Sequence, residues 1–136
     1  MENATRKSKK IDRICIMESD RLLSDFMVLI LEEFGFKIDI LSNKAEIQTY
    51  ITEKRPRLYI IDVFLPQWNG LEIIQYMQEN DLLSGTRVIV ISAFGYQEVV
   101  QQAILNGASD FLLKPFEKQT LLAKVRTQLM ELYHGG

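Results

Sequence analysis

The sequence predicts an α/β protein in which helices cover both faces of a parallel β-sheet. Two features of the chain indicate this fold. Short apolar runs of strand length alternate with longer segments whose apolar residues recur at helical spacing, and such alternation is typical of β/α units. One run, at residues 58–61, is apolar at every position, which is the pattern of a strand buried on both faces.

The pattern predicts five strands and five helices in strict alternation. The expected strands cover residues 14–17, 36–41, 58–62, 87–92 and 110–113, and the expected helices cover residues 20–34, 44–54, 70–80, 96–106 and 117–133. For five β/α units the common doubly wound strand order is 2-1-3-4-5, which gives a flavodoxin-like three-layer sandwich. All the parallel strands place their carboxyl ends at the same end of the sheet, and reactive groups are expected there.

Turn and cap residues mark where several of these elements begin and end. Gly35 and Gly107 follow two predicted helices, at positions where glycine commonly ends a helix. Ser42 or Asn43 is expected to cap the helix at 44–54. Apolar residues recur at helical spacing in the first helix: Leu22, Leu23, Phe26, Ile30 and Phe34.

Length and composition indicate one ordinary globular domain. We expect this domain at residues 11–134, after a disordered basic tail at residues 1–10. The net charge of −2 gives no reason to expect nucleic acid or an anionic membrane as partner. Cys15 and His134 are the only residues of their types, which excludes an internal disulfide and argues against histidine catalysis. No apolar run is long enough to span a bilayer, so the cytoplasm is the expected location.

Polar side chains are predicted at the ends of four strands. Asp62 ends the central strand, Glu18 follows the first strand, Ser92 ends the fourth and Lys114 follows the fifth. Two carboxylates suit a hard cation such as Mg²⁺, which binds through one or two carboxylates, phosphate oxygens and water. A hydroxyl and a lysine would cover two further sides of a phosphoryl group. Asp62 is then a carboxylate nucleophile that accepts this group.

Three separated stretches carry a resemblance to a known family. They are Asp62 with Pro66 and Gly70, the pair Ser92-Ala93, and the run from Gly107 to Phe116, which reads GASDFLLKPF. These stretches resemble the receiver domain of bacterial two-component response regulators, over about residues 11–133. The resemblance implies that Asp62 accepts a phosphoryl group from a sensor histidine kinase or a phosphotransfer protein. It also implies a surface change that a downstream output protein reads.

The resemblance assigns roles to the residues around Asp62. It implies that Ser92 contacts the phosphoryl group, that Lys114 pairs with it, and that Ser92 and Phe111 act as switch residues. The expected activity is that of a signalling domain and not of an enzyme that turns over a substrate. We further expect a cis Lys114-Pro115 bond, and an inward-facing Phe111 before phosphorylation because its ring gains nothing from water.

The metal site departs from the family pattern. The family carries two adjacent acids after the first strand, whereas this chain has Glu18 followed by the neutral Ser19. The expected Mg²⁺ ligands are Glu18, Asp62 and the backbone carbonyl of Phe64, with Ser19 or Asp20 as a further candidate. Asp20 is the better candidate for the N-cap of the first helix. The missing charge predicts weak Mg²⁺ binding.

Three other functions are weighed against phosphoacceptance. A divergent receiver that binds its partner without phosphorylation is the close alternative, because of Ser19. An aspartate-dependent phosphatase or phosphotransferase typically needs a second acid two residues after the first, where this chain has Phe64. A flavodoxin-like electron carrier needs a glycine-rich phosphate loop, which the sequence lacks. A homodimer is left open, as is the choice between a stand-alone receiver and a piece of a larger regulator.

Overall fold

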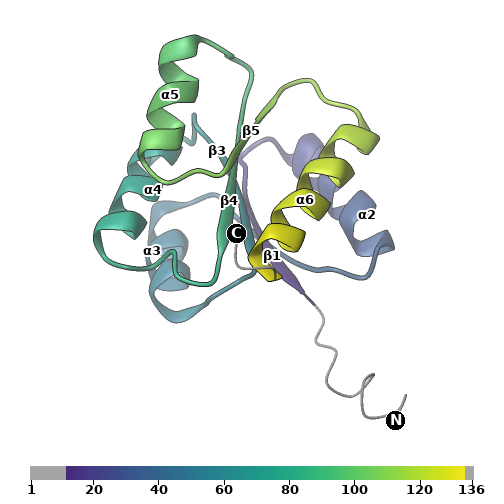
Figure 1. The fold of residues 1–136 in the computed structure, drawn as a ribbon, viewed down its shortest axis with the longest axis horizontal. Coiled ribbons are helices and arrows are strands. Elements are labelled where there is room, and N and C mark those ends of the chain that lie inside the picture. The colour runs from purple at the N-terminus through teal and green to yellow at the C-terminus, as the bar shows by residue number, and fades with distance from the viewer. Residues whose placement is uncertain (1–11, 134–136) are drawn as a thin grey trace.

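Five parallel strands form the centre of the part that the computed structural model describes, residues 12–133. The strands are β1 (Arg13–Met17), β2 (Lys37–Leu41), β3 (Leu58–Asp62), β4 (Arg87–Ser92) and β5 (Asp110–Leu113). The helices are α2 (Arg21–Glu33), α3 (Lys44–Glu53), α4 (Gly70–Glu79), α5 (Gln97–Leu105) and α6 (Lys118–Tyr133). The strand order is β2-β1-β3-β4-β5, which confirms the predicted topology (Figure 1).

Helices cover both faces of the sheet and produce three layers. Helices α3, α4 and α5 lie on one face, and α2 and α6 lie on the other (Figure 1). Each face has its own cluster of buried side chains, because a sheet covered on both sides must bury both of its surfaces.

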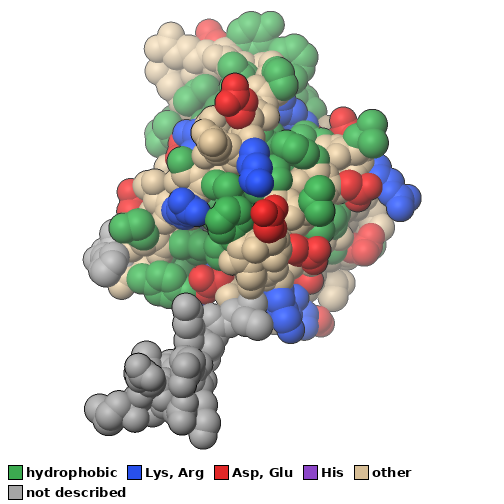
Figure 2. Space-filling view, turned by 90° about the vertical axis from the view of Figure 1, so that its right-hand side faces the viewer, with side chains coloured by type: hydrophobic (Ala, Val, Ile, Leu, Met, Phe, Trp, Pro, Cys, Tyr) green, Lys and Arg blue, Asp and Glu red, His purple; other side chains and the backbone are tan. Residues whose placement is uncertain are grey.

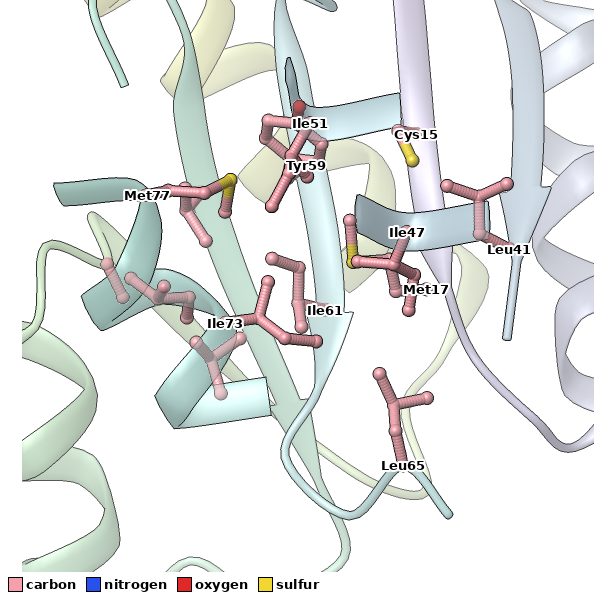
Figure 3. Close-up of a cluster of buried hydrophobic side chains, with 14 of the residues drawn as sticks. Cys15, Met17, Leu41, Ile47, Ile51, Tyr59, Ile61, Leu65, Ile73 and Met77 are labelled. Carbon is pink, nitrogen blue, oxygen red and sulfur yellow. The ribbon is translucent and has the colours of Figure 1, made fainter. Parts of the chain in front are cut away.

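Successive residues of the inner strands point into opposite clusters. Ile14 and Ile16 of β1 pack with α2 and α6, whereas Cys15 and Met17 pack with α3 and α4 (Figure 3). The central strand β3 is buried at all five positions. This double burial explains why the sequence is apolar at every position of 58–61.

Side chains cap the beginnings of three helices, α2, α3 and α4. Asp20 Oδ1 accepts a hydrogen bond from the backbone N–H of Leu23 at 3.2 Å, so Asp20 is the N-cap of α2. Asn43 Oδ1 accepts one from the N–H of Glu46 at 2.9 Å, so Asn43 and not Ser42 caps α3. Asp20 therefore has the capping role that the sequence favours for it.

The spaced apolar residues that predicted helix α2 are mostly not the residues that it buries. Its buried residues are Ser24, Met27, Ile30 and Leu31, whereas Leu22 is 83% exposed and Phe26 and Phe34 are exposed. Apolar residues occur all round this helix, so their spacing alone does not say which side faces the sheet. The space-filling view from the α2 and α6 side shows hydrophobic side chains scattered among charged ones (Figure 2).

Two predictions fall outside the described residues: the basic tail at residues 1–10 and the position of His134. Within residues 12–133, no helix combines the length and the apolar character that crossing a membrane requires.

Candidate functional site

Asp62 lies at the carboxyl end of the central strand, and its side chain is buried, with the residue only 5% exposed. The backbone N–H of Phe64 donates a hydrogen bond to Asp62 Oδ1 at 3.1 Å. The loop then returns to the strand, because the N–H of Gly70 donates to the carbonyl of Val63 at 2.7 Å. A Cβ atom at position 70 would lie 2.2 Å from the carbonyl oxygen of Asp62, so only glycine fits this close approach.

Lys114 reaches both acidic side chains of the site. Its Nζ lies 2.8 Å from Asp62 Oδ2 and 2.7 Å from Glu18 Oε1. The Lys114-Pro115 bond is cis, as predicted, and the backbone N–H of Lys114 donates to the carbonyl of Ser92 at 2.8 Å. The structure therefore brings together the carboxylates and the lysine that the sequence placed at separate strand ends.

Glu18 is bound by the protein through both of its carboxylate oxygens. While Oε1 pairs with Lys114, Oε2 accepts a hydrogen bond from the backbone N–H of Asp20 at 3.1 Å. The residue is 3% exposed, and burial raises the pKa of its carboxyl even though Lys114 opposes this shift. The sequence predicted a metal ligand here, and the structure places Glu18 first of all as a partner of the lysine.

Lys114 remains a strong base in this setting. Burial lowers its pKa, but the hydrogen bonds and the negative charges of Asp62 and Glu18 outweigh that effect and raise the pKa above its ordinary value. The lysine therefore carries a fixed positive charge next to the Asp62 carboxylate at neutral pH.

Ser92 and Phe111 lie on the strands next to the site. Ser92 is fully buried at the end of β4, and its Oγ accepts a hydrogen bond from the N–H of Phe94 at 3.0 Å. Phe111 on β5 is half-buried and packs against the cluster on the α3, α4 and α5 side. Phe111 was expected to face inward, and its side chain is only partly buried.

The donors for a cation are few. Ser19 and Asp20 are exposed, and the Asp20 carboxylate is used to cap α2. In the described part of the chain, no group of three or more His, Cys, Asp or Glu residues could hold a metal ion. Glu18 and Asp62 with the Phe64 carbonyl remain, and two carboxylates are within the usual range for Mg²⁺. The donor set therefore fits a weakly held Mg²⁺.

Aromatic side chains at the rim of the site were not predicted. The rings of Phe64 and Phe94 meet edge to face at 5.4 Å between centroids, and Tyr96 stacks on Phe94 at 5.8 Å. All three side chains are exposed. They lie on loops, where no periodicity signals a contact. The Trp68 ring packs against Tyr76 of α4 at 5.6 Å between centroids.

Comparisons with known proteins agree on one family. Residues 14–126 match the family model described as the response regulator receiver domain. The chain is 33% identical over 114 residues to the transcriptional regulatory protein CrdR of Helicobacter pylori, an alignment that covers 84% of this chain and 53% of CrdR. It is 27% identical over 117 residues to the DNA-binding response regulator MtrA of Mycobacterium tuberculosis, covering 86% of this chain and 50% of MtrA. The chain thus spans about half the length of these curated relatives.

Solved structures show the same architecture. A CheY-like response regulator receiver domain protein from Methanospirillum hungatei superposes with a TM-score of 0.85 at 25% identity, over 93% of this chain and all of that one. A response regulator from Thermotoga maritima superposes with a TM-score of 0.79 at 25% identity, over 89% of this chain and 99% of that one.

Proposed function

Because the chain belongs to the response regulator receiver domain family, we propose that Asp62 accepts a phosphoryl group from a sensor histidine kinase or a phosphotransfer protein. The observation that carries this proposal is the buried Asp62 carboxylate, which ends the central strand and touches the Lys114 ammonium at 2.8 Å. A receiver is a signalling domain and not a classical enzyme, so the phosphorylated protein itself is the product that matters.

The proposed transfer is a single displacement reaction at the phosphorus atom. A carboxylate oxygen of Asp62 forms the new bond to phosphorus, and the bond from phosphorus to the donor breaks, so the donor leaves with the electron pair of that bond. Lys114 would neutralise charge on the phosphoryl oxygens, and the buried hydroxyl of Ser92 would donate a hydrogen bond to one of them. The proposed roles rest on Lys114, which pairs with Asp62, and on Ser92, which ends the neighbouring strand β4.

Mg²⁺ would be held by Glu18, Asp62 and the backbone carbonyl of Phe64, with Ser19 or Asp20 as a further candidate. When bound, the cation supplies positive charge that offsets the phosphoryl oxygens. The neutral Ser19 leaves this site one charge short, so we propose that binding is weak and phosphorylation slow.

Signalling is proposed to pass through Ser92 and Phe111 to the surface formed by α5 and β5, where an output protein reads it. The relatives are named as DNA-binding or transcriptional regulators, and the chain matches about half of their length. For this chain we predict a kinase or phosphotransfer partner, an output protein and a cytoplasmic location. A homodimer is compatible with these predictions. A receiver that binds its partner without phosphorylation is the second candidate, and Ser19 is the observation that favours it.

Incubation with Mg²⁺ and acetyl phosphate, followed by intact-mass measurement, tests the proposal. We expect a mass increase of one phosphoryl group in the wild-type chain and none in Asp62→Asn. Asp110→Asn is the matched control, because Asp110 is a half-buried aspartate at the other end of a strand, paired with Lys124 at 2.9 Å. An Asp62→Asn protein that gains the same mass would reject Asp62 as the acceptor.

A further inference from the structure

Helix α5 is attached to the domain much more firmly at its C-terminal end than at its N-terminal end. Its N-cap, Tyr96, is 62% exposed and makes no side-chain cap hydrogen bond. Val99 and Val100 in the first turn are only half-buried, and Ala103 is the one buried residue of the helix. The first half of α5 therefore has few contacts that hold it against the sheet.

The C-terminal end, by contrast, closes with a full set of backbone hydrogen bonds. The N–H of Ala108 donates to the carbonyl of Ala103 at 2.9 Å, and the N–H of Gly107 donates to the carbonyl of Ile104 at 3.0 Å. This pair of bonds is the Schellman pattern, and the φ of +114° at Gly107 is the left-handed conformation that the pattern requires. Ala108 is buried directly after it.

Asn106 adds a hydrogen bond from this end of α5 to another helix. Its side chain is buried, with the residue 7% exposed, and Nδ2 donates to the carbonyl of Leu71 in α4 at 2.9 Å. Asn106 Oδ1 accepts a hydrogen bond from Gln102 Nε2 at 2.8 Å. Because the Leu71 carbonyl can only accept, the Asn106 amide has one orientation that satisfies both partners.

The point of attachment lies close to Asp62 along α4. Leu71 follows Gly70, whose backbone packs against the carbonyl of Asp62. Figure 1 shows α4 and α5 on the same face of the sheet, and their residues contact one another. The last turn of α5 is therefore hydrogen-bonded to the first turn of the helix that begins after the Asp62 loop.

We propose that Asn106 is the positioning residue of α5: its amide fixes the C-terminal end of the helix to α4 as a pivot, about which the less attached N-terminal end moves. A buried amide whose nitrogen and oxygen each make a hydrogen bond resists displacement, since breaking either bond leaves a buried polar group unsatisfied. The proposal does not depend on phosphorylation of Asp62 and is testable without it.

Amide hydrogen exchange of the wild-type chain gives the first test. We expect the amide of Val100 in the first half of α5 to exchange about tenfold faster than those of Asn106 and Ala108 at its C-terminal end. Equal exchange along the helix, or faster exchange at the C-terminal end, would overturn the proposal.

Substitution of Asn106 gives the second test. In Asn106→Ala and Asn106→Asp we expect the amides at the C-terminal end of α5 and in the first turn of α4 to exchange about five- to tenfold faster, with the rest of the sheet unchanged. The aspartate variant keeps an oxygen for Gln102 but loses the donor to Leu71. Because its carboxylate also adds a buried negative charge, its effect is compared with that of the alanine variant, which adds none.

Asn80→Ala is the matched control. Asn80 is also the C-cap of its helix, and its Nδ2 also donates to a backbone carbonyl, that of Tyr76 at 2.8 Å, but the bond stays within α4. This control should speed exchange only at the end of α4. Unchanged exchange in α5 of Asn106→Asp, or a uniform increase through the whole domain, would show that Asn106 has no positioning role.

Discussion

The Lys114 ammonium lies 2.8 Å from Asp62 Oδ2, although the two residues are 52 positions apart in the sequence. Lys114 follows β5, which is two strands away from β3, so its side chain must cross the end of β4 to reach the carboxylate. The backbone hydrogen bond from Lys114 to the Ser92 carbonyl holds the lysine at that crossing point. The lysine side chain thus reaches from the end of the edge strand β5 to the end of the central strand β3.

Removing the lysine charge should destabilise the domain. In Lys114→Met the carboxylates of Asp62 and Glu18 remain buried without their shared counter-charge, and we expect the free energy of unfolding to fall by about 2–4 kcal/mol at pH 7. Urea denaturation measures this loss, which should shrink at acid pH as the Glu18 carboxyl, whose pKa burial raises, takes up a proton.

Lys118→Met is the control for this prediction. Its Nζ lies 3.6 Å from Glu33 on the surface, and both side chains are about half exposed. Such a pair contributes less than about 1 kcal/mol. Equal losses of unfolding free energy in the two variants would mean that Lys114, between two buried carboxylates, stabilises the fold no more than a surface ion pair does.

Much of this arrangement follows from sequence, because it depends on periodicity. Alternation of strands and helices predicts the strand order. The strand order then predicts that four polar residues lie together at the carboxyl ends of the strands: Asp62, Glu18, Ser92 and Lys114. The buried face of α2 was not predictable from spacing, since apolar residues surround that helix. The bond from Asn106 to Leu71 was not predictable either, because a side chain that reaches the backbone of another helix leaves no sequence pattern.

Gly70→Ala should disturb the loop that holds Asp62. The added Cβ would lie 2.2 Å from the Asp62 carbonyl oxygen, so the backbone must move. We expect a loss of at least about 2 kcal/mol in the free energy of unfolding, together with a lower rate of phosphorylation. Gly35→Ala separates this clash from ordinary glycine strain, since position 35 has a φ of +90° but no atom within 4 Å of a new Cβ. That variant should lose about 1 kcal/mol and be phosphorylated normally.

Tyr50 should make the stability of the fold sensitive to alkali. Its hydroxyl donates to Asp39 Oδ2 at 2.7 Å, and burial, with the neighbouring Cys15 and Asp39, raises its pKa far above the ordinary value. The folded state keeps this proton when the unfolded state has lost it. The stabilisation is therefore complete below about pH 10 and is lost as the pH rises further.

Tyr50→Phe should reduce the alkaline slope of the unfolding free energy by about 1.4 kcal/mol per pH unit above pH 10. The substitution should also cost about 1–2 kcal/mol at pH 7 through the lost hydrogen bond. Tyr76→Phe, which changes an exposed tyrosine on α4, should leave the slope unchanged. The same slope in wild type and Tyr50→Phe would contradict the prediction.

Ser19 should limit the affinity for Mg²⁺. The neutral side chain leaves one negative charge fewer beside the proposed ligands Asp62 and the Phe64 carbonyl, and a unit charge at ~4 Å contributes ~4 kcal/mol at an effective dielectric of 20, less where solvent screens it. We expect Ser19→Asp to tighten Mg²⁺ binding about tenfold. Trp68 is half-buried on the loop after Asp62, so its fluorescence is suited to follow the titration.

The double variant Glu18→Asp with Ser19→Asp should bind Mg²⁺ more tightly still. Mg²⁺ demands near-ideal octahedral geometry, and the shorter aspartate lacks the methylene with which Glu18 reaches Lys114. Ser84→Asp, an acid added on an exposed loop at the opposite end of the sheet, should leave the affinity unchanged. Wild-type binding as tight as that of the double variant would show that the acidic pair has been misinterpreted. If neither protein binds Mg²⁺, the receiver that acts without phosphorylation becomes the better hypothesis.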